Sequence, residues 1–169
     1  MIAAVVCAAP QVADLRGAMA RLKPRASRKL HWHDLSQRPL MRQQALDSLN
    51  LLPLKIVVAI RVDVAGSRPE RLRRMCMESL VMTLDKIGVD KIVAESRGPA
   101  DDLRDIEHFV AMQSRRIPGA SIRLAHIPGP EDPALWSADA VAGAVATAIK
   151  GDDSYLARLN RVTLVQFGP

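Results

Sequence analysis

Apolar and polar residues recur along this chain with two periods, and each period predicts one type of element. Apolar residues three or four positions apart predict helices at 11–22, 40–52, 67–87, 99–115 and 134–150, and a further short helix at 152–159. Runs rich in Val and Ile predict buried strands at 2–8, 54–64, 89–95, 121–127 and 162–167. Residues 30–34 alternate, which is compatible with a further short strand. Strands that alternate with helices predict an α/β sheet domain with helices on both faces.

The chain length and composition predict one folded domain. At 169 residues the chain is long enough for a single core, so we expect one domain over 1–169. Its 49% hydrophobic and 25% charged residues are ordinary for a folded protein. Aromatic residues make up only 3%, which argues against a nucleic-acid site built from stacked rings. Lys and Arg outnumber Asp and Glu by 24 to 18, and the resulting net charge of +6 permits a polyanionic partner.

The two cysteines and the apolar opening of the chain indicate the compartment. Cys7 and Cys76 form no short-spaced pair, so the sequence predicts small core residues in a reducing compartment rather than a disulfide framework or a zinc knuckle. Residues 1–9 lack a basic leader and are soon followed by Pro10 and Asp14, so we expect neither a signal peptide nor a membrane span. These features predict a cytoplasmic protein.

Several acidic residues lie where an apolar element ends or packs. Glu95 ends a short Ile/Val strand, Asp101 and Asp102 begin the following helix, and Asp139 has apolar neighbours on an Ala-rich helix. A buried carboxylate is costly unless its charge is compensated, and a divalent cation would compensate it. Oxygen ligands favour Mg2+ or Mn2+ over zinc.

Each of these acids also has a structural interpretation. Glu95 could pair with Arg97 instead of a metal, and the two interpretations carry equal weight. Asp101 and Asp102 lie in a first helical turn, where capping and the helix dipole favour acids, so we prefer the structural role for them. Asp105 is predicted to lie on the surface. Asp139 could be an acid of an early helical turn.

The histidines are weaker candidates for a metal or proton-transfer site. On a strand, His31 and His33 would face one side and Trp32 the other, so the two histidines could bind zinc. Without a third ligand, hydrogen bonds to the backbone are the preferred interpretation. We expect His126 near the same sheet end as Glu95, where it is a candidate proton carrier.

Two basic clusters are candidate phosphate-binding sites. One is a loop with Arg25, Arg28 and Lys29, and the other is a helix start with Arg68 and Arg71. Arg97 is a further candidate for nucleic-acid binding. A solvated surface is the commoner role of such clusters. On the second cluster's helix, Glu78 is placed to pair with Arg74 at a spacing of four residues.

Three segments together resemble a known family. They are the run Leu30, His31 and Trp32, the turn 95–98 with the following Asp101, Asp102 and Asp105, and the sequence Leu-Trp-Ser-Ala-Asp-Ala-Val-Ala-Gly at 135–143. They resemble an uncharacterised RNase H-like family, domain of unknown function three-thousand-eight-hundred, over nearly the whole chain. The resemblance implies an RNase H-like mixed sheet and a carboxylate cluster like that of two-metal nucleases, which hold two cations about 4 Å apart.

The chain departs from that family at its start. Members open with a strand ending in Asp-Glu-Ser, whose Asp is taken as the central metal ligand, and Met1 falls where the second strand would begin. We therefore expect the first strand to be missing or mis-started, which would expose a sheet edge and favour a homodimer. The resemblance leaves Glu95, Asp139 and either Asp101 or Asp102 as ligands for Mg2+ or Mn2+, and ranks Asp34 below them.

Two functions are compatible with these observations. One is metal-dependent hydrolysis of nucleic-acid phosphodiesters. Its candidate catalytic residues are Glu95, Asp101, Asp102 and Asp139. The other is a non-catalytic module that binds nucleic acid or a protein through Arg-rich surfaces or an exposed sheet edge. The sequence has no Gly-rich phosphate loop, nucleophile elbow or Cys/His pair at catalytic spacing, which argues against a nucleotide kinase, a serine hydrolase and a thiol enzyme.

Overall fold

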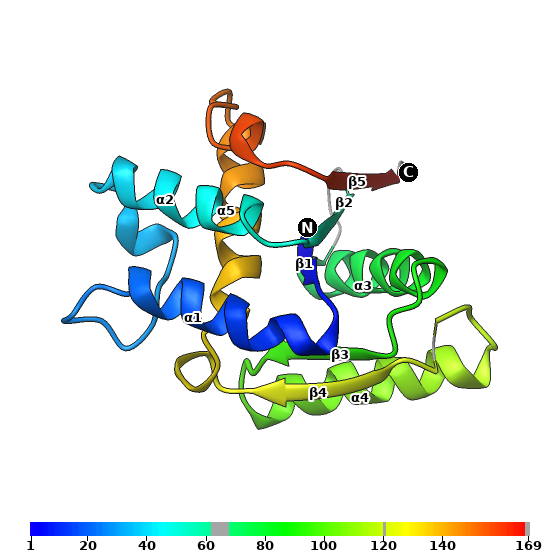
Figure 1. Ribbon diagram of the computed structural model, residues 1–169. Coiled ribbons are helices and arrows are strands. Elements are labelled where there is room, and N and C mark those ends of the chain that lie inside the picture. The colour runs from blue at the N-terminus through cyan, green and yellow to red at the C-terminus, as the bar shows by residue number, and fades with distance from the viewer. Residues whose placement is uncertain (62–67, 120, 168–169) are drawn as a thin grey trace. The chain divides into compact units, whose positions relative to one another are not determined.

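A computed structural model describes residues 1–61, 68–119 and 121–167, and it shows an α/β protein (Figure 1). The helices are α1 (Val12–Leu22), α2 (Pro39–Asn50), α3 (Pro69–Lys86), α4 (Pro99–Ser114) and α5 (Leu135–Ile149). The strands are β1 (Ile2–Val6), β2 (Lys55–Arg61), β3 (Lys91–Glu95), β4 (Arg123–Ile127) and β5 (Val162–Phe167). Each of them lies where the periodicity predicts it, so the α/β class is confirmed.

Helix starts follow the local sequence. Pro39, Pro69 and Pro99 occupy the first positions of α2, α3 and α4, where a missing N–H costs nothing and a fixed φ suits the helix. The predicted cap Ser67 and the predicted strand end at 62–64 lie outside the described residues. Arg68 occupies the N-cap position of α3, and its side chain makes no capping hydrogen bond.

The described strands form a sheet of three, in the order β1-β2-β5, and a parallel pair, β3 and β4. The central strand β2 buries Ile56 to Ala59 in succession, as expected of a strand covered on both faces. In the parallel pair, Ala94 lies opposite His126 and Glu95 opposite Ile127. The RNase H-like topology and a homodimer through a sheet edge stay predictions.

Two predicted elements are corrected. Residues 30–34 do not form a strand, because His33–Leu35 is a 3₁₀ turn in which the Asp34 N–H bonds to the His31 carbonyl at 3.1 Å. Local turn bonds satisfy this backbone, whereas a strand needs a partner along its whole length. At 152–159 only Leu156–Arg158 is helical, and it is a 3₁₀ turn.

The chain divides into two compact units, each built from segments that are distant in the sequence. The first unit comprises Met1–Ala4, Val57–Pro128 and Thr163–Pro169, and the second comprises Val5–Ile56 and Gly129–Val162. The single domain over 1–169 stays a prediction. None of the described helices is both long and apolar enough to cross a membrane.

Each unit has an aliphatic core. In the second unit, α1, α2 and α5 pack together through residues such as Met19, Leu46 and Val141. In the first unit, α3 buries Cys76, Leu80, Val81 and Leu84. Cys76 is a core residue as expected, whereas Cys7 is partly exposed.

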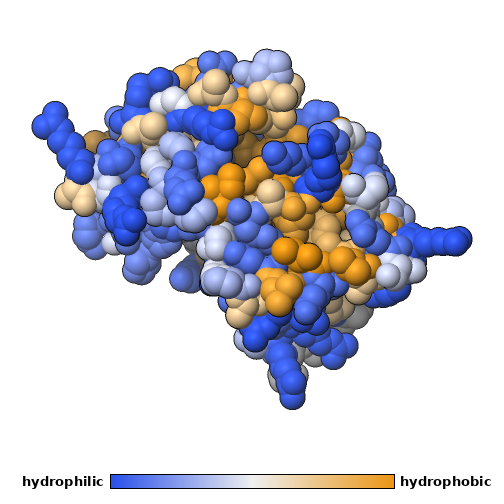
Figure 2. Space-filling view, turned by 90° about the horizontal axis from the view of Figure 1, so that it is seen from below, coloured by the Kyte–Doolittle hydropathy of each residue, from blue (hydrophilic) through white to orange (hydrophobic). Residues whose placement is uncertain are grey.

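Helix α4 has two apolar faces. One face buries Phe109 and Met112, and the other exposes Leu103, Ile106 and Val110, each close to half of its surface. Helix α4 is drawn at the bottom of Figure 1. Figure 2 views the molecule from below and shows hydrophobic residues on that surface. The apolar spacing of α4 therefore did not by itself determine which face is buried.

An ion pair between a half-exposed arginine and a buried carboxylate stabilises the second unit. Arg16 of α1 donates to both carboxylate oxygens of Asp132, at 2.9 and 2.6 Å, and Asp132 also accepts the Ala134 N–H just before α5. The hydrogen bonds from Arg16 hold the pKa of Asp132 below its ordinary value, although burial acts in the opposite direction. The pair thus fastens α1 to the start of α5.

This lowered pKa predicts a pH dependence of stability. The contribution of Asp132 is present above the unfolded-state pKa of about 3.9 and is lost as the pH falls through the lower folded-state pKa. We expect the free energy of unfolding to fall less steeply below about pH 4 in Asp132→Asn than in the parent protein. Urea unfolding at pH 7, 4 and 3 measures this difference, and exposed Asp153, changed to Asn, is the control. Equal slopes in the parent and in Asp132→Asn would contradict the prediction.

Candidate functional site

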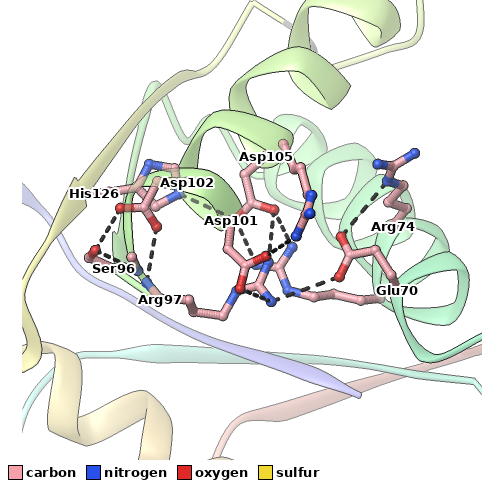
Figure 3. A network of polar contacts seen from close by, with 11 residues as sticks. Glu70, Arg74, Ser96, Arg97, Asp101, Asp102, Asp105 and His126 are labelled. Atoms are coloured by element: carbon pink, nitrogen blue, oxygen red, sulfur yellow. Dashed lines mark hydrogen bonds and ion pairs between the residues drawn. The ribbon is translucent and has the colours of Figure 1, made fainter.

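A buried carboxylate lies at the centre of a polar network in the first unit (Figure 3). Asp105 of α4 is only 4% exposed, and Arg73 of α3 donates to both of its oxygens, with Nη2 to Oδ2 at 2.7 Å. Arg97 Nη2 lies 3.4 Å and His126 Nε2 3.3 Å from the same carboxylate. Because a buried carboxylate needs compensation, these side chains hold α3, α4 and β4 around Asp105.

The prediction that Asp105 lies on the surface is wrong. Asp105 is four residues before Phe109 and seven before Met112, so it shares the buried face of α4. Arg73 likewise precedes the buried Met77 and Leu80 by four and seven residues on α3. The sequence analysis missed this pair, although a charge in register with an apolar face on each of two helices is a signal that could have identified it.

Arg97 lies among three carboxylates rather than on an open cationic surface. Its guanidinium nitrogens are 3.8 Å from Glu70, 3.5 Å from Asp101 and 3.4 Å from Asp105. Glu70 also pairs with Arg74, at 3.8 Å. The partner of Arg74 is thus Glu70 and not the predicted Glu78. The three acids compensate Arg97, which makes it a poor phosphate ligand in this conformation.

Asp102 fixes the turn between β3 and α4. Its carboxylate accepts the Ser96 hydroxyl at 2.6 Å and the Arg97 N–H at 3.0 Å. The hydrogen bond from Ser96 is the main reason that the pKa of Asp102 lies below its ordinary value, and the Arg97 N–H adds to it. Asp101 and Asp102 both lie in the first turn of α4, as predicted.

Glu95 and His126 lie at the same end of the parallel pair. Glu95 is the last residue of β3, His126 is next to last in β4, and the Ser96 N–H bonds to the Ile127 carbonyl at 2.9 Å. The carboxyl ends of parallel strands are where α/β proteins commonly bind ligands. Glu95 and His126 thus lie at the end of the pair that is followed by the turn carrying Asp101 and Asp102, but Glu95 is in register with Ile127 and His126 with Ala94, so their side chains face opposite sides of the pair.

Asp101, Asp102 and Asp105 do not fit a divalent cation as they are arranged. Asp101 and Asp105 face guanidinium groups, and both oxygens of Asp102 accept hydrogen bonds from the chain itself. Across the described ranges, no group of three or more His, Cys, Asp or Glu side chains is arranged to hold a metal ion. In this arrangement the chain compensates these acids with its own arginines and hydrogen-bond donors.

Asp139 belongs to the second unit, where it binds a backbone group. Its Oδ2 accepts the Trp32 N–H at 2.7 Å, and its Oδ1 lies 3.9 Å from His31 Nε2. On the other side of the imidazole, His31 Nδ1 is 3.6 Å from Asp34. His33 is exposed and begins the 3₁₀ turn, so the two histidines do not share a strand face, although their rings meet edge-on at 6.4 Å.

Trp32 is enclosed by groups from several segments of the second unit. Arg42 lies 4.6 Å from the centre of its ring and donates to its carbonyl oxygen, and Tyr155 meets the ring edge-on at 5.1 Å. A Cβ atom at Gly143 would be 2.1 Å from Trp32 Cγ, so only glycine leaves room for the ring. The motif at 30–32 and the motif at 135–143 therefore meet around Trp32.

The basic loop (residues 23–29) is braced from within. Lys23 Nζ donates to the Ser27 carbonyl at 2.7 Å and to that of Pro24 at 3.4 Å, and the Ser27 N–H bonds to the Pro24 carbonyl. Arg25 and Arg28 are exposed, and within the described part of the chain neither forms an ion pair. Arg68 and Arg71 at the start of α3 are likewise exposed and form no ion pair with a described acid.

Comparison of the chain with protein-family models, with curated proteins and with solved structures finds no match. The resemblance of the three motifs to an RNase H-like family therefore stays a prediction. The placement of the residues carries the functional argument that follows.

Proposed function

We propose that this chain is an RNase H-like protein that binds nucleic acid through the basic loop of the second unit. The start of α3, in the first unit, is a separate candidate contact. The observation that carries this proposal is the bracing of the loop. Lys23 is used inside the loop, while Arg25 and Arg28 point their charge to solvent without a partner acid in the described chain. Nineteen residues from Leu15 to His33 include six Lys and Arg and no acid.

A loop of this kind suits a phosphate backbone. Exposed guanidinium groups neutralise phosphates and release counterions, and this term dominates affinity that is independent of base sequence. The chain has few aromatic rings for base stacking, and both Trp residues are buried. We therefore expect affinity that depends strongly on salt and weakly on sequence.

The start of α3 supports the same function. Arg68 and Arg71 lie at the positive end of the helix dipole, where cations are unfavourable and anions favourable. Glu70 is the acid in the first turn, and it faces Arg74 and Arg97. A phosphate at this position would relieve the repulsion between the two exposed arginines and the helix end.

The first test changes the loop. In the double variant Arg25→Gln/Arg28→Gln, we expect affinity for a fluorescent oligonucleotide to fall at every sequence tested. The slope of log K against log salt should decrease by about 2, because each lost phosphate contact lowers it by about 1. Fluorescence anisotropy at several salt concentrations measures both quantities.

The matched control removes the same charge elsewhere in the second unit. Lys55→Gln/Lys150→Gln changes two exposed lysines outside the loop, and it should change the slope less than the loop variant. Equal effects of the two double variants would show that net charge alone attracts the oligonucleotide. Absence of binding by the parent protein would refute the proposed function.

Metal-dependent phosphodiester hydrolysis is the second candidate function. It is favoured by the position of Glu95, Asp101 and Asp102 at the carboxyl end of β3, although among the described residues no three such side chains are arranged to hold a metal ion. If the acids keep the arrangement described above, calorimetric titration with manganese should give no saturable binding. Saturable binding by the parent protein that is lost in Glu95→Gln would instead support the hydrolase and justify a nuclease assay.

A further inference from the structure

We propose that Asp139 and Gly143 of α5 are positioning residues that hold the C-terminal end of the basic loop. This inference rests on the proposed function, in which that loop binds nucleic acid. The two residues touch neither Arg25 nor Arg28. They act through Trp32, which follows the last loop residue by three positions.

The contacts of Trp32 show how α5 would do this. Asp139 accepts its N–H at 2.7 Å, and Arg42 donates to its carbonyl oxygen at 3.0 and 3.3 Å. Gly143, one helical turn after Asp139, leaves the space that the indole ring fills. Both backbone polar groups and the ring of this single residue are thus fixed, and Trp32 is only 8% exposed.

The other end of the loop is fixed as well. Lys23 follows α1 directly and holds the carbonyls of Pro24 and Ser27 through its ammonium group. With both ends held, Arg25 and Arg28 lie in a segment that loses little further freedom when it binds. Preorganisation of this kind raises affinity because less ordering remains to be done on binding.

Because Asp139 is acidic, a change of net charge and a loss of loop position have opposite effects on affinity when Asp139 is removed. Removing an acid makes the protein more positive, which by itself would tighten binding to a polyanion. If Asp139 positions the loop, its removal should instead weaken binding to the polyanion. Asp139→Ala removes the acceptor of the Trp32 N–H, and Asp139→Asn keeps an amide oxygen that can accept it.

The experiment measures oligonucleotide affinity and hydrogen exchange together. We expect Asp139→Ala to weaken binding about three- to tenfold, the size associated with ordering a few flexible side chains, and to flatten the salt dependence. Asp139→Asn should restore most of the affinity. Gly143→Ala should weaken binding as Asp139→Ala does, because its methyl group displaces Trp32.

The controls match each change. Asp153→Ala removes an exposed acid of the same unit and should bind as tightly as the parent or more tightly. Gly17→Ala adds a methyl group to a helix of the same unit at ordinary contact distance, 3.4 Å from Arg21, and should bind like the parent. Circular dichroism confirms that each variant is folded at the assay temperature.

Hydrogen exchange of the free protein decides the inference independently of binding. Amides of residues 25–32 should exchange faster in Asp139→Ala and Gly143→Ala than in the parent and the controls. Unchanged exchange there, or tighter binding by Asp139→Ala, overturns the inference. If the parent binds no oligonucleotide, the proposed function fails, and the exchange data still determine whether α5 holds the loop.

Discussion

Asp105→Ala is expected to lower the free energy of unfolding by about 3–5 kcal/mol, because it leaves the largely buried guanidinium of Arg73 without its carboxylate partner. Arg73 donates to both oxygens of Asp105, and Arg97 and His126 lie within 3.4 Å of it. The loss should therefore be that of a broken buried ion pair rather than of a surface contact. Urea unfolding at pH 7, monitored by circular dichroism, measures it.

Two further variants test the cause. Asp101→Ala removes a more exposed acid of the same helix and should cost about 0–1 kcal/mol, as surface ion pairs do. In Arg73→Met/Asp105→Leu both main partners become apolar, and this double variant should be more stable than Asp105→Ala alone. A cost of Asp105→Ala no greater than that of Asp101→Ala would contradict the buried network.

Gly119→Ala is the second change with a large expected effect. Gly119 has φ +83°, and a Cβ atom there would be 2.7 Å from the Val81 carbonyl oxygen and 2.9 Å from Asp85 Cβ on α3. The left-handed backbone costs a non-glycine residue about 1–2 kcal/mol, and forcing α3 away costs a further 1–3 kcal/mol by rough estimate. We expect a total loss of about 2–5 kcal/mol in the same unfolding measurement.

Gly88→Ala separates the two contributions. Gly88 has nearly the same φ, +79°, but no atom lies within 4 Å of its added Cβ. It should show the backbone cost alone, about 1–2 kcal/mol. The difference between the two variants then measures the close approach of the 116–119 turn to α3. Equal losses would mean that the turn moves away from α3 freely.

The sequence was sufficient for the elements because their signals are local. Helical spacing of apolar residues placed α1 to α5, and runs of Val and Ile placed β1 to β5, since both patterns depend on neighbours a few positions apart. Segment 30–34 shows the limit of this approach. Five residues cannot distinguish a strand from a turn when the distinction depends on whether a partner strand is present.

The candidate site shows the same limit more clearly. The sequence placed Glu95 and His126 at one sheet end and Asp101 and Asp102 in a first helical turn, because strand order and helix start follow from local pattern. It missed the burial of Asp105, because α4 has an apolar stripe on each of two faces and periodicity does not say which one packs inward.

By itself, then, the sequence determined the α/β alternation and the two clusters of exposed arginines. Only the tertiary structure decided the partners of the charged side chains. Asp105 meets Arg73 across 32 positions of the chain, and Asp139 meets the Trp32 N–H across 107. The physical reason is that a charge is compensated by whichever group the fold brings near it, and that group need not be close in the sequence.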